Sequence, residues 1–144
     1  MRGRKESVTP QQIDLVQASW KQVAPVAETA AQMFYGRLFF LDPSLRPLFL
    51  GDMREQGQKV MAMISYTVNG LTRLQVLLPA IRALGRRHAT YGVRPEHYYT
   101  VGAALLWTLE QGLGAAFTPE IREAWVAAYG VIANTMRDAA EISA

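Results

Sequence analysis

The sequence contains no cysteine and only two histidines, and these shortages exclude several common kinds of functional site. Without cysteine the chain forms no disulfide bond, offers no thiolate nucleophile or metal ligand, and carries no thioether-linked cofactor. Two histidines without neighbouring carboxylates cannot complete a zinc site. The sequence also lacks a GxSxG elbow, a glycine-rich phosphate loop and an HExxH motif. Because no carboxylate pair stands in an apolar setting that would raise a pKa, acid–base catalysis is poorly supported.

Long apolar runs are missing as well. The longest candidate, Val101–Leu109, is much shorter than the roughly 18 apolar residues of a membrane span, and it contains Gly102 and Thr108. The N-terminus is basic but has no apolar segment behind it, which argues against a signal peptide. A chain of 144 residues, half of them apolar, suits one globular domain. We therefore expect a soluble, cytoplasmic, single-domain protein that does not enter a membrane.

The formal charge of +3 does not by itself indicate a nucleic-acid partner. The first six residues supply +2 of this charge through three basic side chains and Glu6, and the rest of the chain is nearly balanced in total. The pattern predicts a basic N-terminal tail, residues 1–8, followed by one folded domain, residues 9–140. A solvated tail explains the charge, so we expect no nucleic-acid binding.

Proline, glycine and capping residues divide the chain into helical segments. Thr9 is a suitable N-cap residue, because Pro10 follows it at the first helical position. Gln12 stands three residues after Thr9, where a capping box requires it. Convincing period-2 alternation is absent, so strands are not expected. Uneven helix lengths argue against an up-down bundle and predict an all-α fold of six to eight obliquely packed helices. The expected segments are Pro10 to about Val23, Pro25 to Leu41, a short turn at Ser44–Phe49, Met53–Asn69, Leu74 to Gly92 with an interruption at Pro79, Pro95 to Gly112, and Pro119 to about Asp138.

Three polar residues lie among apolar ones at helical spacing. His88 follows Leu84 by one turn, which places it on the apolar side of its helix. Gln56 begins an apolar stripe that continues with Val60, and Tyr35 lies in the segment Phe34–Phe39 (FYGRLF), which is mostly apolar. Taken singly, each has a structural reading: a satisfied core histidine, a surface residue at a helix end, and a core tyrosine. None of the three signals is specific by itself.

The order of these residues resembles that of the globin family over about Val8–Met136. Leu84–Val93 (LGRRHATYGV) resembles the proximal helix, whose histidine binds haem iron, and this implies that His88 is the metal ligand. Glu55–Met61 (EQGQKVM) is similar to the distal helix, where the position of Gln56 faces bound ligand. The two residues are 32 positions apart, as the resemblance requires.

Two further segments carry the resemblance. Phe39–Phe49 (FFLDPSLRPLF) is similar to the passage between the second and third helices, and this implies that Phe49 packs on the haem. Pro119–Asn134 (PEIREAWVAAYGVIAN) resembles the last helix. Within the family, the chain is similar to bacterial single-domain haemoglobins, flavohaemoglobin haem domains and neuroglobin. The implied cofactor is haem b, iron protoporphyrin IX, held without covalent links. Other residues that the resemblance places at the haem are Lys59 (near a propionate, or else solvated), Val60, Ile64, Leu84, Val93 and Tyr98.

The resemblance implies reversible binding of O2, NO and CO. Tyr35 would donate its hydroxyl to bound dioxygen, and Gln56 would donate its amide or hold that hydroxyl in place. The alternative is a nitric oxide dioxygenase that converts NO to nitrate, with Tyr35 and Gln56 as catalytic residues and a separate reductase as partner. A third reading, a haem-free interaction module, is weakened because His88 and Phe49 occur together. The sequence leaves open whether the protein is a monomer or a homodimer.

The sequence departs from the pattern of the family it resembles at two points. Gln56 stands where neuroglobin has a histidine, so a five-coordinate ferrous state is expected. In flavohaemoglobins a tyrosine and a glutamate support the proximal histidine. Tyr98 matches the tyrosine, but Ala140 stands at the position of the glutamate, and Glu141 is the next residue. In the ferric state, water, hydroxide or the Tyr35 phenolate would fill the sixth position, the phenolate only if the pocket lowers the pKa of the phenol.

Overall fold

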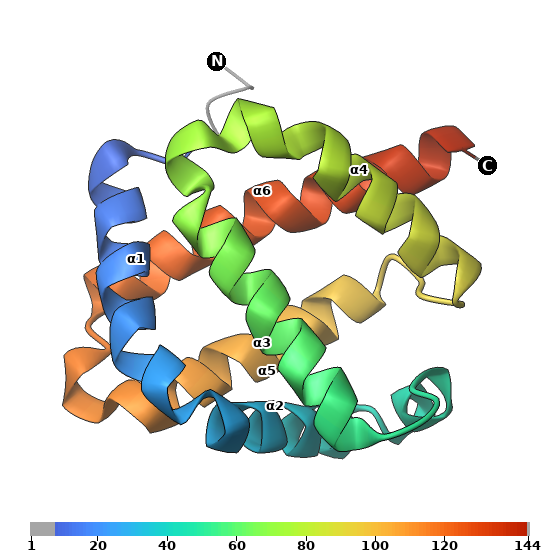
Figure 1. The fold of residues 1–144 in the computed structure, drawn as a ribbon, viewed down its shortest axis with the longest axis horizontal. Helices are drawn as coiled ribbons and strands as arrows, with labels where there is room; N and C mark the ends of the chain where they lie inside the picture. The colour runs from blue at the N-terminus through green and yellow to red at the C-terminus, as the bar shows by residue number, and fades with distance from the viewer. Residues whose placement is uncertain (1–7, 144) are drawn as a thin grey trace.

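A computed structural model describes residues 8–143, and these form six α-helices and four short 3-10 helices without any strand (Figure 1). This confirms the predicted all-α class. The tail predicted for residues 1–8 lies outside the described residues, apart from Val8. None of the described helices is long and apolar enough to cross a membrane. In chain order the elements are α1 (Pro10–Val23), η2 (Ala24–Val26), α2 (Ala27–Leu41), η3 (Pro43–Leu48), α3 (Met53–Asn69), η4 (Leu71–Arg73), α4 (Leu74–Thr90), α5 (His97–Leu113), η5 (Gly114–Ala116) and α6 (Pro119–Ser143).

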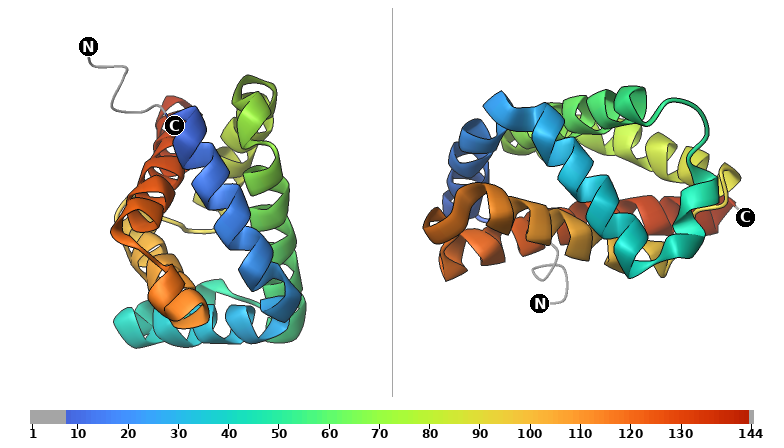
Figure 2. Two further views of the ribbon diagram at one scale, coloured as in Figure 1. Left: turned by 90° about the vertical axis from the view of Figure 1, so that its left-hand side faces the viewer. Right: turned by 90° about the horizontal axis from the view of Figure 1, so that it is seen from below.

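The helices pack on one another obliquely, as the sequence predicted. α6 makes its main contacts with α1 and α4, whereas α2 packs on α3 and α5. Figure 1 and the left view of Figure 2 show α2 across the bottom of the molecule and α1 against α6. α1 begins with the predicted capping box, because Thr9 and Gln12 exchange side-chain bonds with each other's main-chain N–H groups at 3.1 and 3.0 Å.

Pro79 does not interrupt its helix, so that part of the prediction is wrong. α4 runs continuously from Leu74 to Thr90. A proline has no N–H to donate, which leaves the carbonyl group of Gln75 without its usual partner. Pro79 and Gln75 are both exposed, so water can hydrate this carbonyl and the helix continues.

Other boundaries also differ from the predicted ones, most of them by one or two residues. α2 begins at Ala27 because residues 24–26 form a 3-10 turn around Pro25. α5 begins at His97 because the residues from Arg94 onward form another tight turn first. α6 continues to Ser143, five residues beyond the predicted end. These shifts do not alter which helices are present.

The hydrophobic core is divided into two clusters. The larger cluster joins α1, α2, α3, α5 and α6, whereas the smaller one joins α4 to α6 through Leu77, Ile81 and Met136. Among the described residues α4 has no extensive contact with α2, α3 or α5. The inner side of α4 and the inner sides of α2 and α3 therefore belong to separately packed parts of the molecule.

The approach of α4 to α6 depends on Gly85. A Cβ atom at this position would lie 2.4 Å from the main-chain oxygen of Met136 and 2.6 Å from its Cα. Main-chain atoms inside a helix cannot yield as a flexible side chain can. Glycine at position 85 thus fixes how closely the helix that carries His88 lies against α6.

Candidate functional site

His88 is held with one ring nitrogen bonded and the other available. Its Nδ1 lies 2.9 Å from the carbonyl oxygen of Leu84, one turn earlier on α4. A carbonyl only accepts, so Nδ1 carries the proton and Nε2 keeps its lone pair. Burial lowers the pKa of His88; the bond to Leu84 opposes this shift, and the charge of Arg87 adds to it. The side chain is therefore a neutral imidazole with Nε2 unprotonated, the form that binds metals.

The described residues do not gather a cluster of metal-binding side chains around this position. No group of three or more histidine, cysteine, aspartate or glutamate side chains comes together within them. A single neutral imidazole suits a metal that arrives with its other ligands already in place, as the iron of a porphyrin does. The donor set of this chain therefore fits haem and does not fit a site built from protein ligands alone.

An aromatic group lies on the side of the molecule formed by α2, η3 and α3. Tyr35 stacks on Phe39, with ring centroids 5.9 Å apart, and meets the ring of Phe49 edge-on at 5.2 Å. Phe39 and Phe49 are themselves 5.5 Å apart. Phe49 is half-buried and packs against the larger core cluster. The structure thus brings Tyr35 and Phe49, two of the predicted site residues, into contact.

The hydroxyl of Tyr35 is buried and only weakly bonded. The side chain is 8% exposed. Its hydroxyl donates to the main-chain oxygen of Gln56 over 3.4 Å, which is longer than the usual range of about 2.5–3.0 Å for such bonds. Burial raises the pKa of Tyr35 to about 12, so the phenol keeps its proton at neutral pH. On the sequence alone, the Tyr35 phenolate would bind ferric iron only if the pocket lowered this pKa, and burial raises the pKa instead.

The side chain of Gln56 bonds to the loop that precedes α3. Its amide Nε2 donates to the carbonyl oxygen of Leu50 at 3.0 Å, within the loop that joins η3 to α3. Only the main chain of Gln56 meets the Tyr35 hydroxyl. In this conformation the glutamine amide fastens the loop and does not orient the tyrosine.

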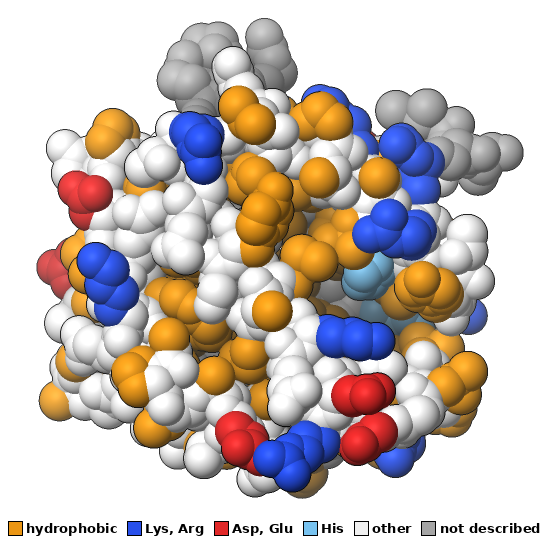
Figure 3. All heavy atoms as spheres, in the orientation of Figure 1, with side chains coloured by type: hydrophobic (Ala, Val, Ile, Leu, Met, Phe, Trp, Pro, Cys, Tyr) orange, Lys and Arg blue, Asp and Glu red, His pale blue; other side chains and the backbone are white. Residues whose placement is uncertain are grey.

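The other predicted contact residues are spread along α3 and α4. Val60 and Ile64 are half-buried against the larger cluster, and Leu84 packs against the smaller one. The N–H of Val93 donates to the carbonyl oxygen of His88 at 3.1 Å and so closes the end of α4. Lys59 is exposed, and the ion pairs found within residues 8–143 do not include it. Figure 3 shows a hollow between α3 and α4, with histidine atoms at its edge.

Tyr98 lies at the beginning of α5 and packs against the smaller cluster. Its carbonyl oxygen accepts a 2.6 Å bond from the hydroxyl of Tyr129. Burial raises the pKa of Tyr98, and the positive charge of Arg137 partly opposes this shift. The charged group that acts on Tyr98 is thus a guanidinium and not a carboxylate. Ala140 is half-buried and Glu141 is exposed.

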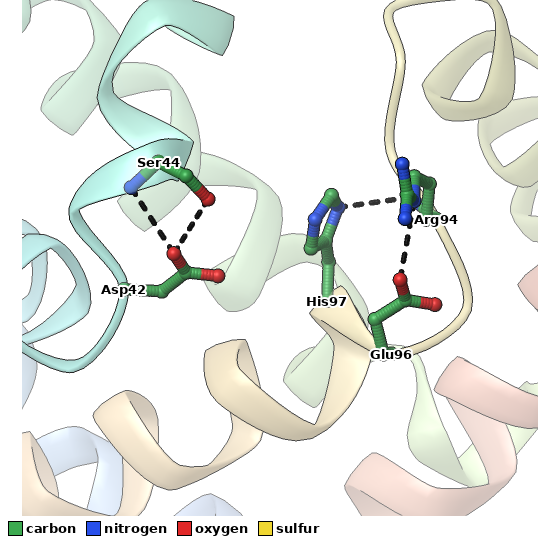
Figure 4. A network of polar contacts seen from close by, with 5 residues as sticks. All are labelled: Asp42, Ser44, Arg94, Glu96 and His97. Carbon is green, nitrogen blue, oxygen red and sulfur yellow. Dashed lines mark hydrogen bonds and ion pairs between the residues drawn. The ribbon is translucent and has the colours of Figure 1, made fainter.

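His97, whose role the sequence left open, stabilises the turn between α4 and α5 (Figure 4). Its Nδ1 accepts from the main-chain N–H of Arg94 at 2.9 Å, and the Arg94 side chain pairs with Glu96 at 3.1 Å. Asp42 faces this turn; its bonds from Ser44 and, more weakly, the charge of His97 lower the pKa of its carboxyl group. These bonds lie around the start of α5, whose N-cap residue, Glu96, makes no side-chain capping bond.

Comparisons with known proteins place the chain within a known family. A family model described as Globin matches residues 32–136. A flavohemoprotein of Bordetella parapertussis is 35% identical over 84% of this chain, which spans about a third of that protein's length (32%). A neuroglobin of Tetraodon nigroviridis is 30% identical, with 91% of each chain covered. A solved hexacoordinated heme protein from an anhydrobiotic tardigrade superposes with a TM-score of 0.85 at 17% identity and covers 96% of this chain.

The fold, the placement of His88 and these matches lead to one conclusion. The family model covers more than half of the chain, and the neuroglobin relative is matched over nearly its whole length. The structural neighbour shares the same helical fold. The chain belongs to the globin family.

Proposed function

We propose that this protein binds haem b between α4 and the aromatic group of Tyr35, Phe39 and Phe49, with His88 as the iron ligand, and reversibly binds diatomic gases. The observation that carries the proposal is the 2.9 Å bond from His88 Nδ1 to Leu84, because it leaves Nε2 unprotonated. Without cysteine the protein has no means of forming thioether links, so the haem is non-covalent. When bound, haem would supply an iron with an open position for O2, NO or CO.

The divided core supports this location. α4 packs on α6 and stays apart from α2 and α3 among the described residues. Half-buried apolar side chains line both parts: Phe49, Val60 and Ile64 on the larger cluster and Leu84 on the smaller one. A flat apolar cofactor inserted between the two parts would bury these side chains further. At about 25 cal/mol for each Å² of apolar surface buried, such insertion stabilises the folded protein.

Tyr35 is the residue best suited to stabilise a polar gas ligand. Its hydroxyl is protonated, buried and bonded to Gln56 over a long distance of 3.4 Å, so it can turn to a better acceptor at little cost. A new hydrogen bond of this kind contributes about 0.5–1.5 kcal/mol, which corresponds to slowing ligand release by up to about tenfold. Slow release suits storage or sensing of dioxygen better than transport.

Nitric oxide dioxygenation is the second candidate. The similarity to proteins named flavohemoprotein favours it, because that name joins haem to flavin, and flavins supply electrons. In this reading Tyr35 holds the gas ligand as before, and an electron-donating partner returns the iron to its ferrous state. The same residues serve both functions, so the assay has to separate them.

Hemin titration followed by gas exchange tests the proposal. We expect one haem per chain, a ferrous form that takes up dioxygen and returns it under vacuum, and the same exchange over many cycles. The absence of stoichiometric haem would refute the proposal. Catalytic consumption of NO, dependent on an added reductase, would identify the second candidate as the activity.

A further inference from the structure

The basic and acidic residues of this protein are unevenly divided along the chain. Residues 56–95, which include most of α3 and all of η4 and α4, contain six lysines and arginines and no aspartate or glutamate. Residues 96–144 contain two basic and six acidic residues. Figure 3 shows the basic side chains gathered over α4, at the upper right of the molecule. The total of +3 conceals this separation of charge.

A groove runs beside this basic helix. It measures about 890 Å³ and lies between α1, η4, α4 and α6. Apolar side chains line much of it, among them Ile13, Leu71, Val76 and Val131. Val76 is 71% exposed, an unusual position for a large apolar side chain. The groove lies outside the aromatic group and the cleft assigned to haem.

Three arginines stand around the groove, and within residues 8–143 none of them forms an ion pair. Arg82 and Arg86 are one turn apart on α4, where like charges repel, and Arg73 lines the groove from η4. All three are exposed. Asp138 also lines the groove, yet the ion pairs found within residues 8–143 join other residues. An apolar floor with an unneutralised basic rim is complementary to a partner with an apolar contact and an acidic rim.

The form of the groove favours a protein over a small anion. Small-molecule pockets enclose most of the surface of their ligand. Here the arginines and Val76 are all exposed, so a small anion would remain largely in water. The chain's own first seven residues have the wrong charge for the groove, since they carry three basic side chains and one acidic one. The complementary occupant is therefore the acidic surface of another protein.

We propose that this groove, with Arg73, Arg82 and Arg86 at its rim, is the docking surface for an acidic electron-transfer protein. The inference rests on the proposed function, which needs a source of electrons in its dioxygenase form. Arg86 is two residues before His88 on α4. An α-helix is about 10–12 Å across with its side chains, so a partner on the outer side of α4 lies only one helix away from the haem ligand.

Binding and electron transfer are measured separately, with plant-type ferredoxin as the acidic probe. Calorimetry gives the affinity of oxidised ferredoxin, and stopped-flow absorbance under carbon monoxide gives the rate at which reduced ferredoxin reduces the ferric protein. The test variant is Arg82→Glu/Arg86→Glu. The control variant, Lys21→Glu/Arg122→Glu, changes the net charge equally at two exposed positions outside the groove. Dithionite reduction of each variant reports on the haem itself.

We expect wild-type affinity and reduction rate to fall at least about tenfold between low salt and about 0.5 M salt. At low salt, the ferredoxin affinity and reduction rate of the Arg82→Glu/Arg86→Glu variant should be at least about tenfold lower than those of wild type. The control variant should stay within about twofold of wild type in both quantities. Dithionite should reduce all three proteins at the same rate. Equal losses in both variants, no loss in either, or no ferredoxin binding by wild type would overturn the inference. Tighter binding of a DNA duplex than of ferredoxin would also overturn it. Because calorimetry does not depend on haem, a protein that binds no haem would refute only the proposed function.

Discussion

The hydroxyl oxygen of Tyr35 lies 3.4 Å from the main-chain oxygen of Gln56, while the amide nitrogen of the same glutamine lies 3.0 Å from the carbonyl oxygen of Leu50. One residue of α3 therefore accepts from the tyrosine through its backbone and fastens the preceding loop through its side chain. The tyrosine donates its single proton over a long distance, so it can turn to a better acceptor at little cost. Replacing Tyr35 and replacing Gln56 should therefore have different effects on the release of dioxygen.

Tyr35→Phe should speed the release of dioxygen by up to about tenfold, because the lost hydrogen bond contributes about 0.5–1.5 kcal/mol. Gln56→Leu should change release less, because its amide bonds to Leu50 and not to the tyrosine. Stopped-flow measurement of oxygen release from both variants provides the comparison. Equal release from wild type and Tyr35→Phe, or a larger effect in Gln56→Leu, would contradict the assignment.

The titration of Tyr35 supplies a test by pH. Burial raises the pKa of its phenol to about 12, above the ordinary value of 10.0. The folded state holds this proton more tightly than the unfolded state, so the associated stability is present below pH 10 and is lost as the pH rises through about 12. In the haem-free protein, the ultraviolet tyrosinate difference between wild type and Tyr35→Phe should therefore appear near pH 12. A difference centred at or below pH 10 would show that the phenol is not buried as described.

Gly85→Ala should destabilise the protein by about 1–3 kcal/mol, because the new Cβ would lie 2.4 Å from the main-chain oxygen of Met136. Gly130→Ala on α6 is the matched control, since a Cβ there meets nothing within 4 Å. The control should gain up to about 1 kcal/mol from the higher helix propensity of alanine. Urea unfolding of the two variants in the same haem state decides the matter. If Gly85→Ala were as stable as its control, the close approach of α4 to α6 would be incorrect.

The helices were predictable from the sequence because their signals are local or lie in one fixed order, whereas His88 as the iron ligand stays a prediction. The capping box at Thr9 and the apolar spacing around His88 depend only on near neighbours along the chain. Pro79 was misjudged because hydration of an exposed carbonyl decides whether a helix survives, and exposure depends on tertiary packing.

The contacts of Gln56 were not predictable for a related reason. Its amide bonds to the carbonyl oxygen of Leu50, and the position of that carbonyl depends on the path of the chain between η3 and α3. The groove beside Val76 was not predictable from the sequence, because its lining residues come from four separate elements, α1, η4, α4 and α6. The run of basic residues in 56–95 was visible in the sequence, but the total charge of +3 masked it.

The ferrous protein without a gas ligand should be five-coordinate. Gln56 is a neutral amide whose side chain is already bonded to Leu50, and His97 is engaged with the main chain of Arg94. Neither is free to occupy the sixth position. Carbon monoxide association should then rise linearly with gas concentration, with no plateau. A rate that saturates, together with a low-spin ferrous spectrum, would show that a protein side chain binds the iron.

Replacing the proposed ligand and supplying it again from solution tests the central claim most directly. His88→Gly removes the imidazole, and His97→Ala is the control because it removes the only other histidine. After reconstitution with hemin, we expect His88→Gly to lose the wild-type ferrous spectrum and most of its haem affinity, and to recover the spectrum when imidazole is added. His97→Ala should keep both. If His88→Gly instead retained the wild-type spectrum and affinity without imidazole, His88 would not be the residue that binds the iron.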